Sequence, residues 1–100
     1  MQSIRRGTTP TIQFTTTLTE NDVSAVYVTI RQGDHVIEKD NNSIVWLESK
    51  IVISLTQEET LGLHTGLADV QIRVKLANSQ ATATQILAIQ VNDILKEGVI

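Results

Sequence analysis

Two histidines and one pair of adjacent carboxylates are the side chains in this sequence best suited to acid–base or metal chemistry. His35 follows Asp34 and precedes Glu38, and His64 lies in a segment with a glycine on each side. Metal sites usually combine three or four converging ligands, and the sequence supplies no cysteine to complete one. Because both histidines adjoin expected turns or loops, where exposed histidines are common, we predict no metal-binding or catalytic role for either.

The carboxylates Glu58 and Glu59 have a structural explanation. Thr56 is followed three residues later by Glu59, which is the pattern of a capping box at the start of a helix. Acidic residues in the first helical turn also interact favourably with the helix dipole. The pattern predicts one or two helical turns over Gln57–Leu61, ended by one of the two glycines that follow, and it explains both carboxylates without catalysis.

Other reactive constellations are missing from the sequence. The absence of cysteine excludes disulfides, thiolate catalysis and zinc–thiolate sites. None of the serines lies in a G-x-S-x-G motif, and the glycines form no phosphate-binding loop. We therefore predict that the protein is not an enzyme and that it holds no cofactor and no metal.

Two aromatic residues are candidates for a binding surface. Trp46 stands between Val45 and Leu47, which favours packing in the core over stacking against a sugar ring. Tyr27 falls on the polar face of its expected strand and is a candidate interface residue.

Charge and hydropathy exclude two classes of partner. The formal net charge is −3 and the isoelectric point is about 5.2, so the chain lacks the basic surface that nucleic-acid binding needs. No apolar run approaches the roughly 20 residues that span a bilayer, and the N-terminus lacks the apolar segment of a signal peptide. We expect no nucleic acid and no membrane as partners, and folding inside the cell that makes the protein.

Alternation of apolar and polar residues is the main structural signal. Val70, Ile72 and Val74 share one face of a strand, while Gln71 and Arg73 share the other, so one face is buried and one is exposed. The predicted strands span residues 11–18, 25–31, 35–39, 43–48, 50–55, 68–76 and 81–91. The segment 43–48 is ambiguous, because its four contiguous apolar residues also suit a strand buried on both faces. The predicted fold class is all-β: an immunoglobulin-like β-sandwich of about seven antiparallel strands with one short helical turn near Gln57–Leu61.

The two ends carry apolar residues outside the predicted strands. We expect an irregular N-terminal arm at residues 1–10, a sandwich domain at 11–91 and a C-terminal tail at 92–100. Apolar residues on free arms need a cover, and the arms either fold back on their own domain or insert into a neighbour. The candidate interface residues are Ile4, Arg5, Arg6, Tyr27, Ile94, Leu95, Val99 and Ile100. If the tail inserts into a neighbour, its deletion should abolish assembly and leave the thermal midpoint nearly unchanged.

Four segments carry a resemblance to a known family: IRRGTTPT at 4–11, VYVTIRQG at 26–33, LTQEETL at 55–61 and VQIR at 70–73. They resemble segments of small virion proteins of tailed phages and prophages of Gram-positive bacteria. The chain is also loosely similar to the N-terminal sandwich domain of the phage baseplate upper protein family. The resemblance implies a non-enzymatic structural role in the tail tip or baseplate. That family has no catalytic motif, so the resemblance assigns no functional residues to this chain. In the family, receptor binding belongs to domains carried on a stalk, and because this sequence shows no stalk, receptor binding is not carried over.

Our expectation is therefore a virion protein, folded in the cytoplasm of a bacterial host, that repeats around a symmetric assembly. Edge strands and terminal arms would join it to other virion proteins and to copies of itself. A capsid decoration protein or a head–tail joining protein would use the same physics at another position. A carbohydrate-binding module for host-surface glycans is the alternative from a different class, and it requires Trp46 or Tyr27 on an exposed platform.

Overall fold

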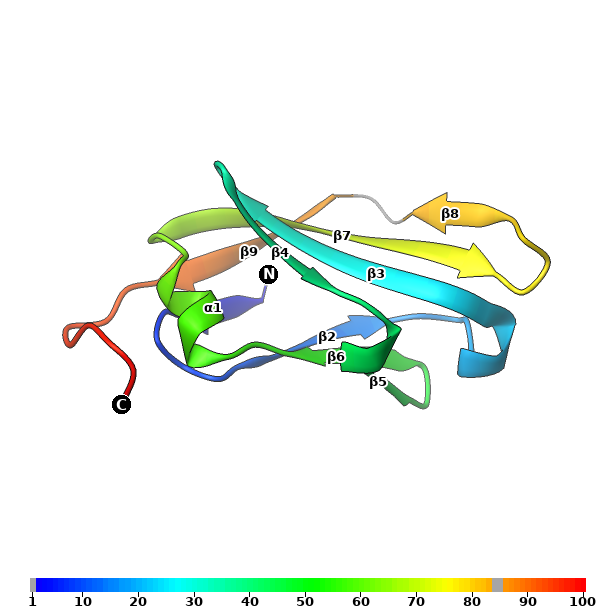
Figure 1. Ribbon diagram of the computed structural model, residues 1–100, viewed down its shortest axis with the longest axis horizontal. Helices are drawn as coiled ribbons and strands as arrows, with labels where there is room; N and C mark the ends of the chain where they lie inside the picture. The colour runs from blue at the N-terminus through cyan, green and yellow to red at the C-terminus, as the bar shows by residue number, and fades with distance from the viewer. Residues whose placement is uncertain (1, 84–85) are drawn as a thin grey trace.

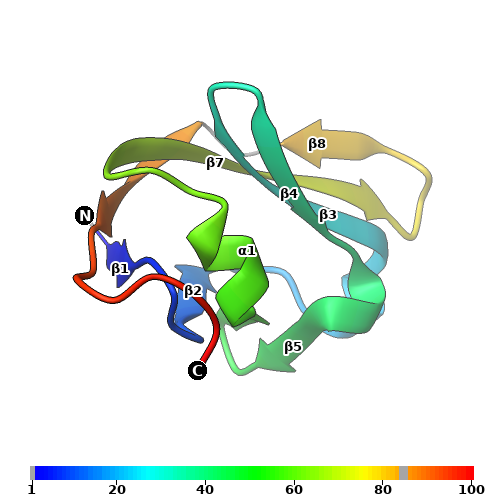
Figure 2. The same ribbon diagram turned by 60° about the vertical axis from the view of Figure 1, so that its left-hand side comes forward.

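The alternating segments pair into two sheets that face each other across an aliphatic core (Figures 1 and 2). This computed structural model describes residues 2–83 and 86–100. Sheet A contains β1 (Ser3–Arg5), β3 (Val23–Gln32), β4 (His35–Lys39), β7 (Gly66–Leu76), β8 (Ala81–Ala83) and β9 (Leu87–Asn92). Sheet B contains β2 (Thr11–Thr15), β5 (Ile44–Leu47) and β6 (Lys50–Ser54). The predicted all-β sandwich is confirmed.

The strand order is that of an immunoglobulin sandwich. Sheet A runs β1-β9-β7-β3-β4, with β8 also paired to β7, and sheet B runs β2-β6-β5. In the immunoglobulin scheme, β2, β6 and β5 take the places of strands B, E and D, whereas β9, β7 and β3 take those of G, F and C. In the described part of the chain, every strand pair is antiparallel except β1 with β9, which is parallel and places Ile4 opposite Val91.

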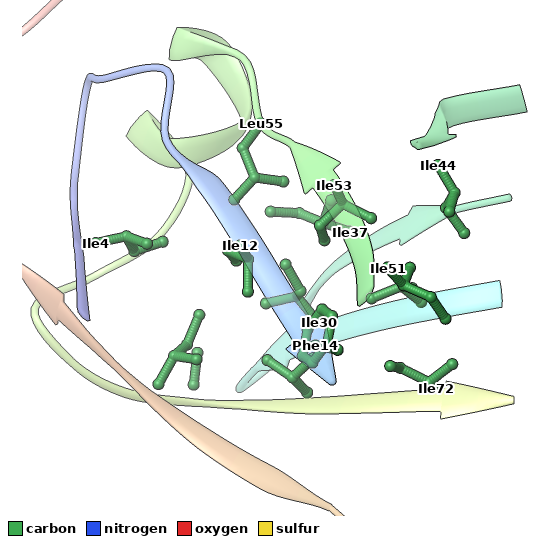
Figure 3. Packing of buried hydrophobic residues seen from close by; sticks show 14 of the residues in the cluster. Ile4, Ile12, Phe14, Ile30, Ile37, Ile44, Ile51, Ile53, Leu55 and Ile72 are labelled. Carbon is green, nitrogen blue, oxygen red and sulfur yellow. The ribbon is translucent and has the colours of Figure 1, made fainter. Parts of the chain in front are cut away.

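Aliphatic side chains from both sheets fill the core, as the low aromatic content requires. Ile12 and Ile53 of sheet B meet Val28, Ile30 and residues of β7 from sheet A, and Figure 3 shows the isoleucines interleaved between the strands. Phe14 is the one aromatic ring that is buried among them. Each fully buried side chain of this kind contributes about 1.5–3 kcal/mol, so many modest contacts stabilise the domain.

The turns follow the local sequence. Gly33 closes the hairpin between β3 and β4 with φ 59°, a left-handed conformation that glycine adopts without strain. Helix α1 spans Gln57–Leu61, as predicted, and both hydrogen bonds of its capping box are present. Gly62 is the C-cap. Short 3-10 turns occur at Glu20–Asp22 and Asn41–Ser43. No helix within the described ranges has the length and apolar character needed to cross a membrane.

Three expected elements differ from the structure. Residues 3–5, expected in an irregular arm, form the strand β1, which pairs with β9 and is held by hydrogen bonds from Arg6 N and to Gln2 O. Residue 1 lies outside the described residues. The predicted strand 81–91 is two strands, β8 and β9, seen apart along β7 in Figure 1, and residues 84 and 85 lie outside the described residues. The strand predicted at 11–18 ends at Thr15.

Candidate functional site

Glu59 of α1 stabilises the start of the helix. Glu59 Oε1 accepts hydrogen bonds from Thr56 N at 2.9 Å and from Lys39 Nζ at 2.8 Å, while Thr56 Oγ1 accepts one from Glu59 N at 3.2 Å. Partial burial raises the pKa of Glu59, but the hydrogen bonds from Lys39 and Thr56 outweigh it and hold the pKa below its ordinary value. Glu59 is therefore an ionised structural group that links α1 to β4.

The two histidines have different environments. His35 packs against Gly62: a Cβ at that glycine would lie 2.7 Å from both Cε1 and Nε2 of the ring. The Nε2 atom is buried and has no hydrogen-bond partner among the residues that the structure describes. His64 is exposed, and its main chain pairs with the side-chain amide of Gln32 at 2.6 and 2.7 Å. Over residues 2–83 and 86–100, no group of three histidine or acidic side chains converges as a metal site would require.

The two aromatic candidates have different environments. Trp46 is half-buried and packs against the core from β5, as the sequence favoured. Tyr27 is exposed on the outer face of sheet A, opposite Arg73 of β7. An open hollow of about 380 Å³ adjoins it, lined by small and cationic side chains that include Arg73 and Lys75. Among the described residues, no carboxylate lines the hollow.

Two of the predicted interface residues belong to the domain itself. Ile4 is 5% exposed and forms part of the core. The Arg6 side chain is 14% exposed and its five N–H groups make five hydrogen bonds. Nε donates to Leu63 O at 2.6 Å, Nη2 donates to Leu61 O at 3.1 Å, and the guanidinium also binds the carboxylates of Asp93 and Glu97. Neither residue is free to bind a neighbour in this conformation.

The C-terminal segment after β9 folds back beside β1 and α1 (Figure 2). Arg5 Nη1 donates to Asp93 O at 2.6 Å, and Ile100 N donates to Gln57 Oε1 at 2.9 Å. Ile94 is half-buried, and its Cδ1 approaches Gly7 so closely that a Cβ there would be 2.7 Å away. The remaining apolar residues of the tail are exposed: Leu95, Val99 and Ile100. The structure thus brings the arginines and the tail together at one end of the molecule, whereas Tyr27 lies on the outer face of sheet A.

The open edges of sheet B are the surface that best suits assembly. β2 and β5 are its edge strands, and neither contains a charged residue. By contrast, the two end strands of the path β1-β9-β7-β3-β4 in sheet A carry charges, with Arg5 on β1 and Glu38 and Lys39 on β4, although the short β8, which pairs with β7, is uncharged. Charged side chains on edge strands normally prevent pairing with other chains. The edges of sheet B lack this protection.

The β5 edge also presents apolar side chains. Val45 is 55% exposed and Leu47 is similarly exposed on the outer face, next to the half-buried Val52 of β6. Burial on both faces was one interpretation of the contiguous apolar run, and it is wrong, because Val45 and Leu47 are exposed. Sequence reasoning missed these two residues as interface candidates, although their position in an uncharged apolar run was a usable signal.

Comparison with known proteins supports the fold. No family model matches the chain, and no curated protein matches it significantly. A solved structure of a proposed glycoside hydrolase from Bacteroides vulgatus ATCC 8482 is similar, with a TM-score of 0.57 and 9% sequence identity over 96% of this chain. The chain spans 17% of the length of that protein. At this identity the likeness is one of fold.

Proposed function

We propose that the chain is a non-enzymatic structural module that joins protein chains through the open edges of sheet B. The observation that carries this proposal is the absence of charge from both edge strands of that sheet, together with the exposed Val45 and Leu47 on β5. An isolated domain with such edges risks uncontrolled strand pairing, whereas an assembly protein uses them for main-chain hydrogen bonds with its neighbours.

The place of this module is a phage virion, in the tail tip or baseplate. The supporting argument is the resemblance of segments 4–11, 26–33, 55–61 and 70–73 to small virion proteins of tailed phages. Its partners there are other virion proteins and copies of the chain. A capsid decoration or head–tail joining role would use the same edges at a different position in the particle.

Mass spectrometry of purified particles tests this placement. Particles are induced from a lysogen that encodes the chain and are separated from free protein on a density gradient. We expect peptides of the chain in the intact particle at several copies each, with cross-links to tail proteins. Cross-links to capsid or neck proteins would move it to another position. Particles that lack the chain would contradict the virion role.

A carbohydrate-binding module is the second candidate, favoured by the hollow beside Tyr27. Sugar rings stack on exposed aromatic faces, and Tyr27 presents one such ring. Glycan-array binding by the purified protein that is lost in Tyr27→Ala would support this candidate. The half-buried Trp46 offers no second platform residue, so the assembly role has the stronger support.

A further inference from the structure

The outward-facing backbone of β2 has a defined pattern. Within the ladder between β2 and β6, Pro10 O accepts from Leu55 N and Thr16 N donates to Ser49 O, each at 3.0 Å. Antiparallel strands alternate the direction of these groups, so the even-numbered residues of β2 face β6. The N–H and C=O groups of Thr11, Gln13 and Thr15 therefore point to the open edge of sheet B.

A side-chain amide already occupies the middle of this edge. Gln2 Nε2 donates to Gln13 O at 2.7 Å, and Gln2 Oε1 accepts from Gln13 N at 3.3 Å. A glutamine amide carries the same donor and acceptor as a peptide group. Gln2 thus reproduces, at one residue, the pair of hydrogen bonds that a neighbouring strand would make. Its main-chain oxygen meanwhile accepts from Gln90 N of β9, so Gln2 bridges the two sheets.

The sequence of β2 is symmetric in residue type about Gln13. Threonines stand at both ends, at 11 and 15, and the apolar Ile12 and Phe14 flank the centre. In an antiparallel pair of two β2 strands related by a two-fold axis at Gln13, Thr11 would lie opposite Thr15 of the other copy. Threonine pairs across strands are favourable, and no like charges would meet. Each of the three outward-facing residues would find an outward-facing partner.

We propose that the β2 edge binds the β2 edge of a second copy of this chain, and that Gln2 covers this edge in the free protein. The two copies would share a continuous sheet in the order β5-β6-β2-β2-β6-β5, with an isologous interface. The Gln2 amide leaves Gln13 when the second strand arrives. This inference rests on the proposed assembly function, because it names one partner and one edge for it.

The interface is small, which sets the strength of the association. A contact of one five-residue strand from each copy lies below the roughly 1,200 Å² of stable complexes. We expect a dissociation constant between about 10 μM and 1 mM. Such a weak contact would still form when many copies are held close together in a particle, because their effective concentration is high.

Light scattering after size exclusion, up to about 1 mM protein, tests the proposal first. The expected result is a concentration-dependent rise from 11.0 kDa toward twice that mass. Gln2→Ala should tighten dimerisation about threefold to tenfold by removing the competing amide, and Ser3→Ala, also exposed and one residue away, should not. A strict monomer for both the wild type and Gln2→Ala would overturn the proposal.

Charge substitutions at the two-fold axis identify the edge. Gln13→Lys and Gln13→Glu each place like charges opposite one another across the axis, so each variant alone should be a monomer. Mixing the two should restore a dimer that contains one copy of each. Circular dichroism checks that both variants are folded. Dimerisation of Gln13→Lys equal to that of the wild type would overturn the proposal.

The particle experiment gives an independent readout. If the chain is present in virions but the Gln13 variants show no change in dimerisation, the β2 inference fails and the assembly function stands. If the dimer forms as expected but particles lack the chain, the virion role fails instead.

Discussion

Arg6 shows how one side chain holds together segments that are far apart in the sequence. Its guanidinium binds the main chain at Leu61, the last residue of α1, and at Leu63, and also the carboxylates of Asp93 and Glu97 after β9. The bond geometry to Glu97 is bidentate, at 2.7 and 3.2 Å, which a lysine cannot reproduce. The hydrogen bonds to Glu97 and then to Asp93 raise the pKa of Arg6, so it stays charged.

We predict that Arg6→Ala destabilises the domain by about 1–3 kcal/mol, because it leaves two carbonyl groups and two carboxylates without their donor. Arg6→Lys should recover less than half of this loss, since it keeps the charge and loses the fork geometry. Urea unfolding measures both changes. Arg5→Ala is the matched control: Arg5 is exposed and donates to Asp93 O, so its effect should be smaller. Equal losses for the two arginines would contradict the assignment.

Glu59 makes stability depend on pH. Its pKa in the folded protein is lowered below the ordinary value of 4.5, so the folded state favours the ionised form. This contribution is fully present above the unfolded pKa and is lost as the pH falls through the folded pKa. Glu59→Gln should therefore cost about 1 kcal/mol at pH 7 and much less at pH 3.

Chemical unfolding of Glu59→Gln and of the wild type at both pH values gives the comparison. Asp93 contributes with the same sign, because the hydrogen bonds from Ile94 N and then from Arg6 lower its pKa as well. The Glu59→Gln variant should therefore still lose some stability in acid. The idea fails if Glu59→Gln costs the same at both pH values.

At the scale of elements, the ends of the chain are parts of the sandwich. β1 extends sheet A by pairing in parallel with β9, and Arg6 N continues the contact by donating to Asn92 O at 2.9 Å. The segment after β9 then returns to Arg6 and Gln57. A parallel pair needs a long connection, and here nearly the whole domain separates the two strands. The arm and tail therefore stabilise the same end of the fold.

We now predict that removing residues 93–100 lowers the thermal midpoint by about 5 °C or more, since Arg6 loses both carboxylates. This reverses the expectation from sequence that the midpoint would hardly change. Differential scanning calorimetry measures the shift. Arg6→Ala should cost less in the shortened chain than in the full chain, because the two changes remove the same interactions. Additive losses would show that the tail stabilises the domain by other contacts.

At the scale of the molecule, the two sheets differ in how their edges are protected. The path of sheet A ends in the charged strands β1 and β4, with the three-residue β8 as an uncharged strand beside it, whereas sheet B ends in β2 and β5, which are both uncharged. The two edges of sheet B also differ from each other: Gln2 covers the middle of β2, while β5 exposes apolar side chains. If both edges bind neighbours, as we propose, one three-stranded sheet would contact two of them on opposite sides, which suits a repeating assembly.

We predict that Val45→Lys, introduced into an inducible prophage, reduces the yield of complete particles at least about tenfold. A lysine on the β5 edge opposes strand pairing and removes apolar contact area. Val36→Lys is the matched control, because Val36 is 52% exposed, close to the 55% of Val45, and its strand β4 already carries charges. Electron microscopy and plaque counts measure the yield. Normal particles from the Val45→Lys prophage would remove β5 from the assembly.

Local sequence determined the elements whose formation depends on neighbours in the chain. The capping box of Thr56 and Glu59 predicts α1 with its bounds, Gly33 predicts the left-handed turn, and period-two alternation predicts β4 and the all-β class. These features depend on hydrogen bonds and side-chain faces within a few residues, and such short-range physics is readable from sequence.

Only the tertiary structure decided which strands are neighbours and which edges stay open. Alternation shows which face of a strand is buried, but the pairing partner depends on contacts between distant residues. Three features join residues from separate parts of the chain: the parallel pairing of β1 with β9, the five hydrogen bonds of Arg6, and the hydrogen bonds between the Gln2 amide and the main chain of Gln13. The candidate site lies on strand edges, and an edge exists only once the sheet has formed, so the sequence alone could not reveal it.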